Sequence, residues 1–133
     1  MTVTIKKVLT LPFAELSLDD NGIIRVNYIG GSIIDVPEKK LLFKAYQELT
    51  SDIKTLFIFQ AQSHVNFTKE AKEYSIRIEP LQPFMAIAVV ADNLAFQLLA
   101  DFYFKVYKPK VAYKVVKSEE KAVEWLLEYR RSH

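Results

Sequence analysis

The chain of 133 residues contains no cysteine. Disulfides, thiolate nucleophiles and cysteine-based zinc or iron–sulfur sites are therefore excluded. No apolar run approaches the roughly 18–20 residues that a membrane-spanning helix needs. The first residues also lack the long apolar region of a signal peptide. We therefore expect a cytoplasmic protein without a membrane span.

An excess of charge of one sign is also missing. The chain has 18 basic and 16 acidic residues, and its net charge is only +2. Five lysines nevertheless gather near the C-terminus, with aromatic residues between them: Lys105, Lys108, Lys110, Lys114 and Lys117. Such a cluster can bind single-stranded nucleic acid or acidic head groups, but lysines also protect an edge strand from pairing with other chains. We favour the second interpretation and expect no nucleic-acid partner.

Half of the residues are hydrophobic, which is typical of a folded globular chain. The length fits one domain over residues 1–133, and no repeat or linker interrupts it. Val3 and Ile5 begin a short strand or an extended arm. Apolar and polar residues then alternate over residues 14–18 and 24–28, on either side of Asn21-Gly22. This arrangement predicts a β-hairpin with a type I′ turn.

The segment after the hairpin predicts a helix that begins near residue 36. Asp35 can act as its N-cap, Pro37 suits the first turn, and Glu38 completes a capping box. The expected buried face consists of Leu41, Leu42, Ala45, Tyr46 and Leu49. The expected solvent face consists of Lys39, Lys40, Lys44 and Gln47.

The rest of the chain alternates between buried strands and helices. Strands are expected at residues 55–59, 84–90 and 111–116, and helices at 68–74, 93–107 and 119–131. The strand at 84–90 contains an unbroken apolar run, which indicates burial on both faces. The alternation predicts an α/β fold, a single domain with a mixed sheet of about five strands and four helices.

This order of elements resembles the STAS domains of anti-sigma-factor antagonists and the core of CRAL-TRIO lipid carriers. Several segments resemble, more closely, a small bacterial family of uncharacterised STAS-like proteins. They are Asn21-Gly22-Ile23-Ile24-Arg25-Val26, Phe67-Thr68-Lys69-Glu70-Ala71, Ala86-Ile87-Ala88-Val89-Val90, Lys108-Pro109-Lys110-Val111 and the start of the last helix at residues 118–126. The resemblance implies a STAS-like βα superhelix after the N-terminal hairpin. It implies no biochemical activity, because these are packing and capping motifs.

Regulatory STAS proteins have an Asp-Ser-Ser/Thr-Gly phosphorylation motif after the middle buried strand. In this chain the corresponding loop contains Ser63 as its only hydroxyl, without the preceding Asp or the following Gly. We therefore expect no regulatory phosphorylation at Ser63.

The same loop is a candidate ligand or partner site, because ligands of open α/β sheets bind beyond the carboxyl ends of the strands. Its polar residues are Gln60, Gln62, Ser63, His64 and Asn66. The alternative is a polar loop that caps the next helix. His64 has no evident orienting partner, His133 is terminal, and Gly30-Gly31-Ser32 lacks the spacing of a phosphate-binding loop. We expect no catalytic residues, no cofactor and no metal.

The helix expected at residues 93–107 is apolar over about two-thirds of its circumference, more than an ordinary surface helix requires. Ala95, Leu98, Leu99, Phe102 and Val106 are expected to pack on the sheet. A second apolar flank then remains, made of Phe96, Ala100, Tyr103, Phe104 and Tyr107. Either the last helix covers this flank through Trp125 and Tyr129, or the flank is a homodimer interface or a pocket for an apolar ligand.

The sequence thus favours a non-enzymatic interaction or regulatory module that acts through protein contacts, with a second copy or with another protein. The alternative is a binder of a small apolar or lipid-like molecule.

Overall fold

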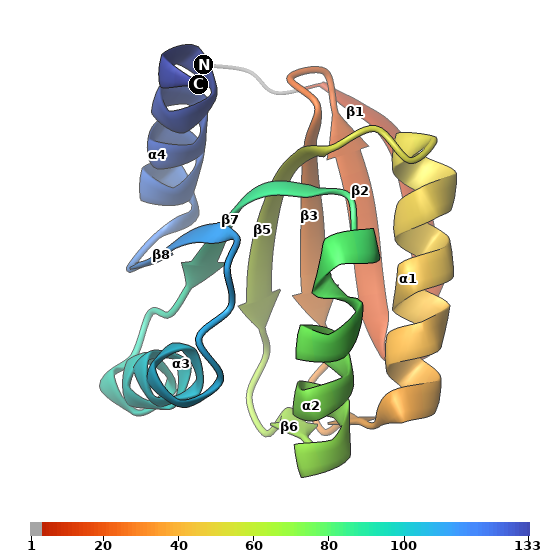
Figure 1. Cartoon of the computed structure of the whole chain (residues 1–133), viewed down its shortest axis with the longest axis vertical. Coiled ribbons are helices and arrows are strands. Elements are labelled where there is room, and N and C mark those ends of the chain that lie inside the picture. The colour runs from red at the N-terminus through yellow and green to blue at the C-terminus, as the bar shows by residue number, and fades with distance from the viewer. Residues whose placement is uncertain (1–3) are drawn as a thin grey trace.

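The computed structural model describes residues 4–133, so Val3 lies outside the described residues. A six-stranded sheet crosses the molecule in the order β1-β2-β3-β5-β7-β8 (Figure 1). Its strands are β1 (Ile5–Leu11), β2 (Ala14–Asp19), β3 (Ile23–Tyr28), β5 (Thr55–Ala61), β7 (Phe84–Val90) and β8 (Ala112–Val116). The first three strands pair antiparallel, and β3, β5, β7 and β8 pair parallel. The predicted mixed α/β sheet is confirmed; it has a sixth strand because the N-terminal arm pairs along β2.

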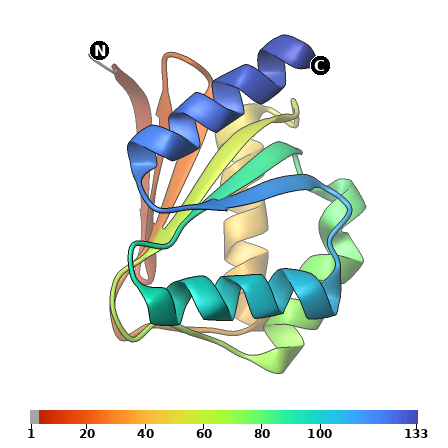
Figure 2. The same cartoon turned by 90° about the vertical axis from the view of Figure 1, so that its left-hand side faces the viewer.

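Helices cover both faces of the sheet. Helices α1 (Val36–Thr50) and α2 (Lys69–Ile78) lie on one side, and α4 (Glu119–Ser132) lies on the other (Figure 1). Helix α3 (Leu94–Tyr107) contacts the edge strand β8 and helix α2 (Figure 2). A small parallel pair, β4 (Ile33–Ile34) and β6 (Asn66–Phe67), and a short 3-10 helix, η1 (Glu79–Leu81), complete the chain.

The predicted hairpin between β2 and β3 is confirmed, but its turn is not type I′. Gly22 has a φ of 80°, whereas Asn21 is not in the left-handed region. The buried carboxylate of Asp19 accepts hydrogen bonds from the backbone N–H groups of Asn21 (2.8 Å) and Ile23 (3.0 Å). A three-residue loop with a left-handed glycine at its end therefore replaces the two-residue loop, because the Asp19 side chain satisfies the backbone of the longer turn.

Helix α1 begins as predicted. Asp35 accepts a hydrogen bond from the backbone N–H of Val36 (2.8 Å), and Glu38 accepts one from the backbone N–H of Asp35 (2.9 Å). The buried face contains Leu42, Ala45, Tyr46 and Leu49. Leu41, which was expected on this face, is 47% exposed, since its position on the helix is at the margin of the buried arc.

The sheet separates two apolar cores. On the α1 side, side chains such as Leu16, Val26 and Phe57 pack against helix α1. On the α4 side, side chains such as Leu56 and Ala88 pack against Ala122 and Leu126 of helix α4. Strand β7 contributes alternate residues to the two cores, as its unbroken apolar run predicts. Within residues 4–133, no helix is long and apolar enough to cross a membrane.

Candidate ligand pocket

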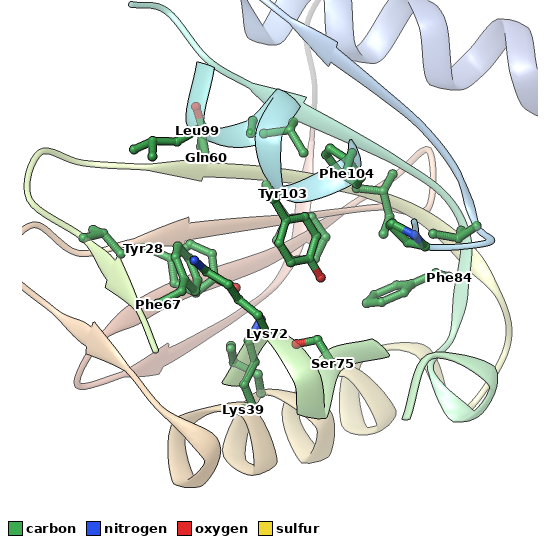
Figure 3. Close-up of a pocket in the computed structure, with 18 of the residues that line it drawn as sticks. Tyr28, Lys39, Gln60, Phe67, Lys72, Ser75, Phe84, Leu99, Tyr103 and Phe104 are labelled. Carbon is green, nitrogen blue, oxygen red and sulfur yellow. The ribbon is translucent and has the colours of Figure 1, made fainter. Parts of the chain in front are cut away.

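A pocket with a volume of about 300 Å³ lies between helix α3 and the sheet (Figure 3). Its base is the α1-facing side of strands β3, β5 and β7, and its other walls come from α1, α2, β6 and α3. Residues of the sheet that line it are Tyr28, Phe59, Gln60, Phe84, Ile87 and Val89. A mostly apolar lining with a few polar groups is typical of sites for small organic molecules, which start at roughly this size.

Helix α3 presents to this pocket the flank that the sequence left unassigned. Phe96, Ala100, Tyr103 and Phe104 all line it, and Tyr107 stacks against Tyr103 with ring centroids 5.1 Å apart. Phe104 is the one buried residue of the helix, at 8% exposure. It stacks face to face on Tyr113 of β8, with centroids 3.9 Å apart. This aromatic stack fixes the rotation of the helix.

The face of α3 that was expected to pack on the sheet is exposed instead. Leu98 and Phe102 are 60% and 61% exposed, and Leu99 and Val106 are also exposed. The expectation was wrong because the stack of Phe104 on Tyr113 holds the opposite flank toward the protein. Leu99 and Phe102 also border the pocket, so they lie at its mouth.

The last helix does not cover the flank, contrary to one of the two interpretations of the sequence. Trp125 and Tyr129 pack with the core on the α4 side of the sheet. The two helices thus lie against different parts of the molecule (Figure 2). The flank is left facing the pocket.

Two lysines reach into the pocket, Lys39 from α1 and Lys72 from α2 (Figure 3). The ammonium nitrogen of Lys39 lies 5.3 Å from the centroid of the Phe67 ring, within the range of a cation–π attraction. Burial lowers the pKa of Lys39 from 10.5 to about 8. Among residues 4–133, neither lysine has an ion-pair partner within 4 Å.

Lys39 was assigned to the solvent face of its helix, and this assignment was wrong. Leu42 and Tyr46, three and seven residues later, are both buried. The spacing i, i+3, i+7 is that of one face of a helix. The periodicity therefore predicts that Lys39 lies on the buried face of the helix. The residue type favours the solvent face, because a lysine side chain is normally exposed.

Glu79 is the acidic residue that lines the pocket. Its Oε1 accepts hydrogen bonds from the backbone N–H groups of Lys110 (2.8 Å) and Val111 (3.2 Å). The carboxylate thus anchors the segment that leads into β8. Its negative charge remains in the pocket, where the two lysines outnumber it and leave a net positive charge.

Three tyrosines contribute neutral hydroxyl groups. Burial raises the pKa values of Tyr28 and Tyr46 above the ordinary value of 10. Burial also raises the pKa of Tyr103 to about 12, with a further contribution from the negative charge of Glu79. All three therefore stay protonated at neutral pH and can donate a hydrogen bond.

Gln82 provides a polar atom without a partner. The residue is 7% exposed and lines the pocket, and its side-chain Oε1 has no hydrogen-bond partner within the described residues. Buried acceptors are almost always satisfied in folded proteins. The Gln82 Oε1 is thus an unsatisfied acceptor that is closed off from solvent.

The polar loop that follows β5 divides between two roles. Gln60 in β5 and Asn66 in β6, on either side of the loop, line the pocket, although the Gln60 amide also donates to Glu119 of helix α4 (3.3 Å). Gln62 and Ser63 instead hold the glycine pair of the preceding turn: the Gln62 Oε1 accepts from the backbone N–H of Gly30 (2.9 Å), and the Ser63 carbonyl accepts from that of Gly31 (3.1 Å). His64 adopts a left-handed backbone with φ 65° and does not line the pocket. Helix α2 is capped by Thr68, whose hydroxyl accepts from the backbone N–H of Ala71 (3.0 Å).

No group of three or more His, Asp or Glu side chains converges within residues 4–133. His133 stacks on Tyr129 at the end of α4, with ring centroids 4.1 Å apart. The lining of the pocket combines apolar surface with two ammonium groups and phenol hydroxyls.

Comparison with known proteins agrees with this fold. Residues 16–130 match the model of a domain of unknown function, DUF7793, and the chain belongs to this family. None of the curated proteins with which it was compared matches it. A solved structure of an uncharacterised protein from Shewanella loihica PV-4, of the DUF3478 family with a SpoIIAA-like fold, is similar with a TM-score of 0.60. The two chains share 8% sequence identity over 95% of this chain and 96% of the other, so this likeness establishes the SpoIIAA-like, or STAS-like, fold.

Proposed function

We propose that this domain binds a small, largely apolar organic molecule in the pocket between helix α3 and the sheet. The observation that supports this function best is the pocket itself. Protein interiors are packed to the density of organic crystals, with few voids larger than a water molecule. The pocket, which is open to solvent, offers about 300 Å³ against Phe59, Phe84 and Ile87, the lower end of the range for small-molecule sites. A bound apolar molecule would bury the surface that the chain leaves uncovered.

The packing of α3 supports the same function. The helix is fixed through Phe104 near its C-terminal end, while Phe96 and Ala100 face the pocket. If the helix served only to cover the sheet, its apolar arc would lie on β7 without a gap. A helix held at one end can instead admit a molecule beneath it. The proposed function involves no catalytic step, and we expect no turnover.

The first test asks whether the pocket is used. We expect native mass spectrometry of protein purified from its own cells to show a retained small mass. We also expect the protein stripped of that mass to bind a neutral apolar fluorophore, N-phenylnaphthylamine. The variant Ala100→Trp should lose both signals, because the indole fills the pocket from the α3 side.

Ala95→Trp is the matched control, since Ala95 lies on the exposed side of the same helix and does not line the pocket. The control should retain both signals. Equal fluorophore binding by the wild type and by Ala100→Trp would show that the dye binds elsewhere. A folded wild type with neither a retained mass nor dye binding would refute the proposed function.

A second candidate function is an interaction or regulatory module that acts through protein contacts. The observation in its favour is the exposed apolar stripe of α3, made of Leu94, Leu98, Leu99, Phe102 and Val106. Contiguous exposed apolar surface often marks an interface. If the stripe joins two copies of this chain, light scattering should give a dimer for the wild type and a monomer for Phe102→Asp. A monomeric wild type at high concentration would exclude self-association as its use.

A further inference from the structure

The positive charge of Lys39 and Lys72 in the pocket indicates which chemical class of ligand it prefers. We infer that the pocket selects an organic acid: an apolar body lies along the aromatic base, and an anionic group binds between Lys39 and Lys72. This inference rests on the proposed function, because it requires that the pocket bind a ligand at all. It goes further by assigning two side chains as an anion site.

The aromatic base gives the pocket a direction. Ring centroids follow one another from Phe84 to Phe59 (5.9 Å), from Phe59 to Tyr28 (6.4 Å) and from Tyr28 to Phe67 (5.0 Å). Lys39 stands over the Phe67 ring at the end of this row. In Figure 3 the Lys39 and Lys72 side chains extend toward the Tyr28–Phe67 end, whereas Phe84 lies at the other end. An elongated molecule with one charged end matches this arrangement.

Within residues 4–133 neither ammonium group has an ion-pair partner within 4 Å, and that of Lys39 is desolvated. Desolvated cations require a counter-charge or hydrogen bonds to be stable. Glu38, the sequence neighbour of Lys39, accepts instead from the backbone N–H of Asp35 (2.9 Å), and Asp35 accepts from the Thr68 hydroxyl (2.7 Å). Glu79 lines the pocket and accepts from the backbone before β8. The lining thus contains two cations and one carboxylate, so its net charge is positive.

The test compares ligands that share one chain and differ in the head group. Octanoate, octyl phosphate, octanol and octylamine are titrated against the full chain at pH 7, through displacement of N-phenylnaphthylamine. Hydrogen bonds to charged groups are stronger than those to neutral groups, so the better acid should bind at least about tenfold more tightly than octanol. Octylamine should bind more weakly than octanol, because like charges repel.

The variant Lys39→Met/Lys72→Met should lose the preference for the acid and keep the affinity for octanol. The matched control is Lys40→Met/Lys69→Met, which removes two exposed lysines of the same helices and should leave the preference unchanged. If circular dichroism shows that the double variant does not fold, salt dependence of the wild type tests the anion site instead. Raised salt should weaken octanoate binding and leave octanol binding unchanged.

The outcomes separate the two proposals. Octanol that binds the wild type as tightly as both acids would overturn the anion site while the pocket function stands. A folded wild type that binds none of the four would refute the proposed function itself. A preference for octyl phosphate over octanoate would support a phosphorylated ligand, such as a lipid, and the reverse preference would support a free carboxylic acid.

Discussion

At the residue scale, Lys39 links the stability of the protein to its proposed ligand. Its pKa is about 8 in the folded protein and about 10.4 in an unfolded chain. Between these values the unfolded state binds more protons at this site, so the contribution of Lys39 to the free energy of unfolding should rise with pH from about 8 to 10.4, against an opposite contribution from the buried tyrosines near pH 10. Below pH 8 both states are protonated, and the destabilisation is fully present. The other titratable side chains that line the pocket are Lys72, Glu79, Tyr28, Tyr46 and Tyr103.

Replacing Lys39 by methionine should therefore stabilise the ligand-free protein at pH 7. We expect the free energy of unfolding to increase by about 1–2 kcal/mol, because a half-buried cation is removed and only part of the gain is lost with the cation–π contact to Phe67. Urea unfolding at pH 7 and pH 10 measures the effect, which should be smaller at pH 10. Lys40→Met, an exposed neighbour, should change neither value. A loss of stability in Lys39→Met at pH 7 would contradict this account.

Asp19 gives a second prediction at this scale. Its buried carboxylate forms an ion pair with Arg25 (2.6 Å) and accepts the two backbone hydrogen bonds of the β2–β3 turn. Asp19→Ala leaves the half-buried Arg25 with its remaining acidic partner, Glu119 (3.2 Å). We expect a loss of about 3–5 kcal/mol in urea unfolding, since one member of a buried pair is removed. Asp20→Ala, an exposed neighbour, should cost less than about 0.5 kcal/mol.

The same residues show what sequence reasoning could and could not predict locally. Asp35 and Glu38 act through neighbours three residues apart, so their capping box was readable from the sequence. The role of Asp19 depends on its burial and on its contact with Arg25, and the Asn-Gly pair suggested a shorter turn. Lys39 was misplaced because a lysine on an amphipathic helix normally faces water.

At the scale of elements, helix α3 depends on one aromatic stack. Phe104 is buried against Tyr113, whereas Phe102, two residues earlier, is largely exposed. Phe104→Ala should lower the free energy of unfolding by about 3–4 kcal/mol, within the range for buried phenylalanine. Phe102→Ala makes the same chemical change on the other face and should cost less than about 1 kcal/mol. Similar losses at the two positions would mean that the exposed stripe is covered in solution.

The rotation of α3 about its own axis could not be predicted from the sequence. Periodicity revealed an apolar arc too wide for one buried face. It could not decide which part of the arc faces the sheet, because Phe104 and Tyr113 meet only after the chain has turned from α3 into β8. Two sets of residues that the sequence had treated as separate sites, one from the polar loop and one from α3, both contribute to the pocket. Gln60 in β5 and Asn66 in β6 border the loop, and Phe96, Ala100, Tyr103 and Phe104 belong to the helix.

At the scale of the whole molecule, the alternation of strands and helices was sufficient to predict the fold. Parallel strands joined by helices allow few topologies, and the buried run at 84–90 identified a central strand. The pocket was not predictable in the same way. It exists because helix α3 is held at the sheet edge by β8 and α2, so its position depends on three elements at once. The sequence predicted that something should cover the apolar flank, and the structure leaves a space there.

This arrangement predicts uneven stability across the molecule. Strands β5 and β7 are buried between two layers of helices, whereas α3 buries only Phe104 among its residues. Elements with few buried contacts open locally at low free-energy cost. In hydrogen exchange, the amides of α3 should therefore exchange much faster than those of β5 and β7.

Octanoate should slow exchange in α3 and in the first turns of α1 and α2, because a ligand beneath the helix joins it to the sheet and to both lysines. Octanoate at the same concentration should leave α4 unchanged, since that helix lies on the other face. Protection that spreads equally to α4 would indicate a general effect of the ligand on the protein, and protection confined to the exposed stripe of α3 would place the ligand outside the pocket.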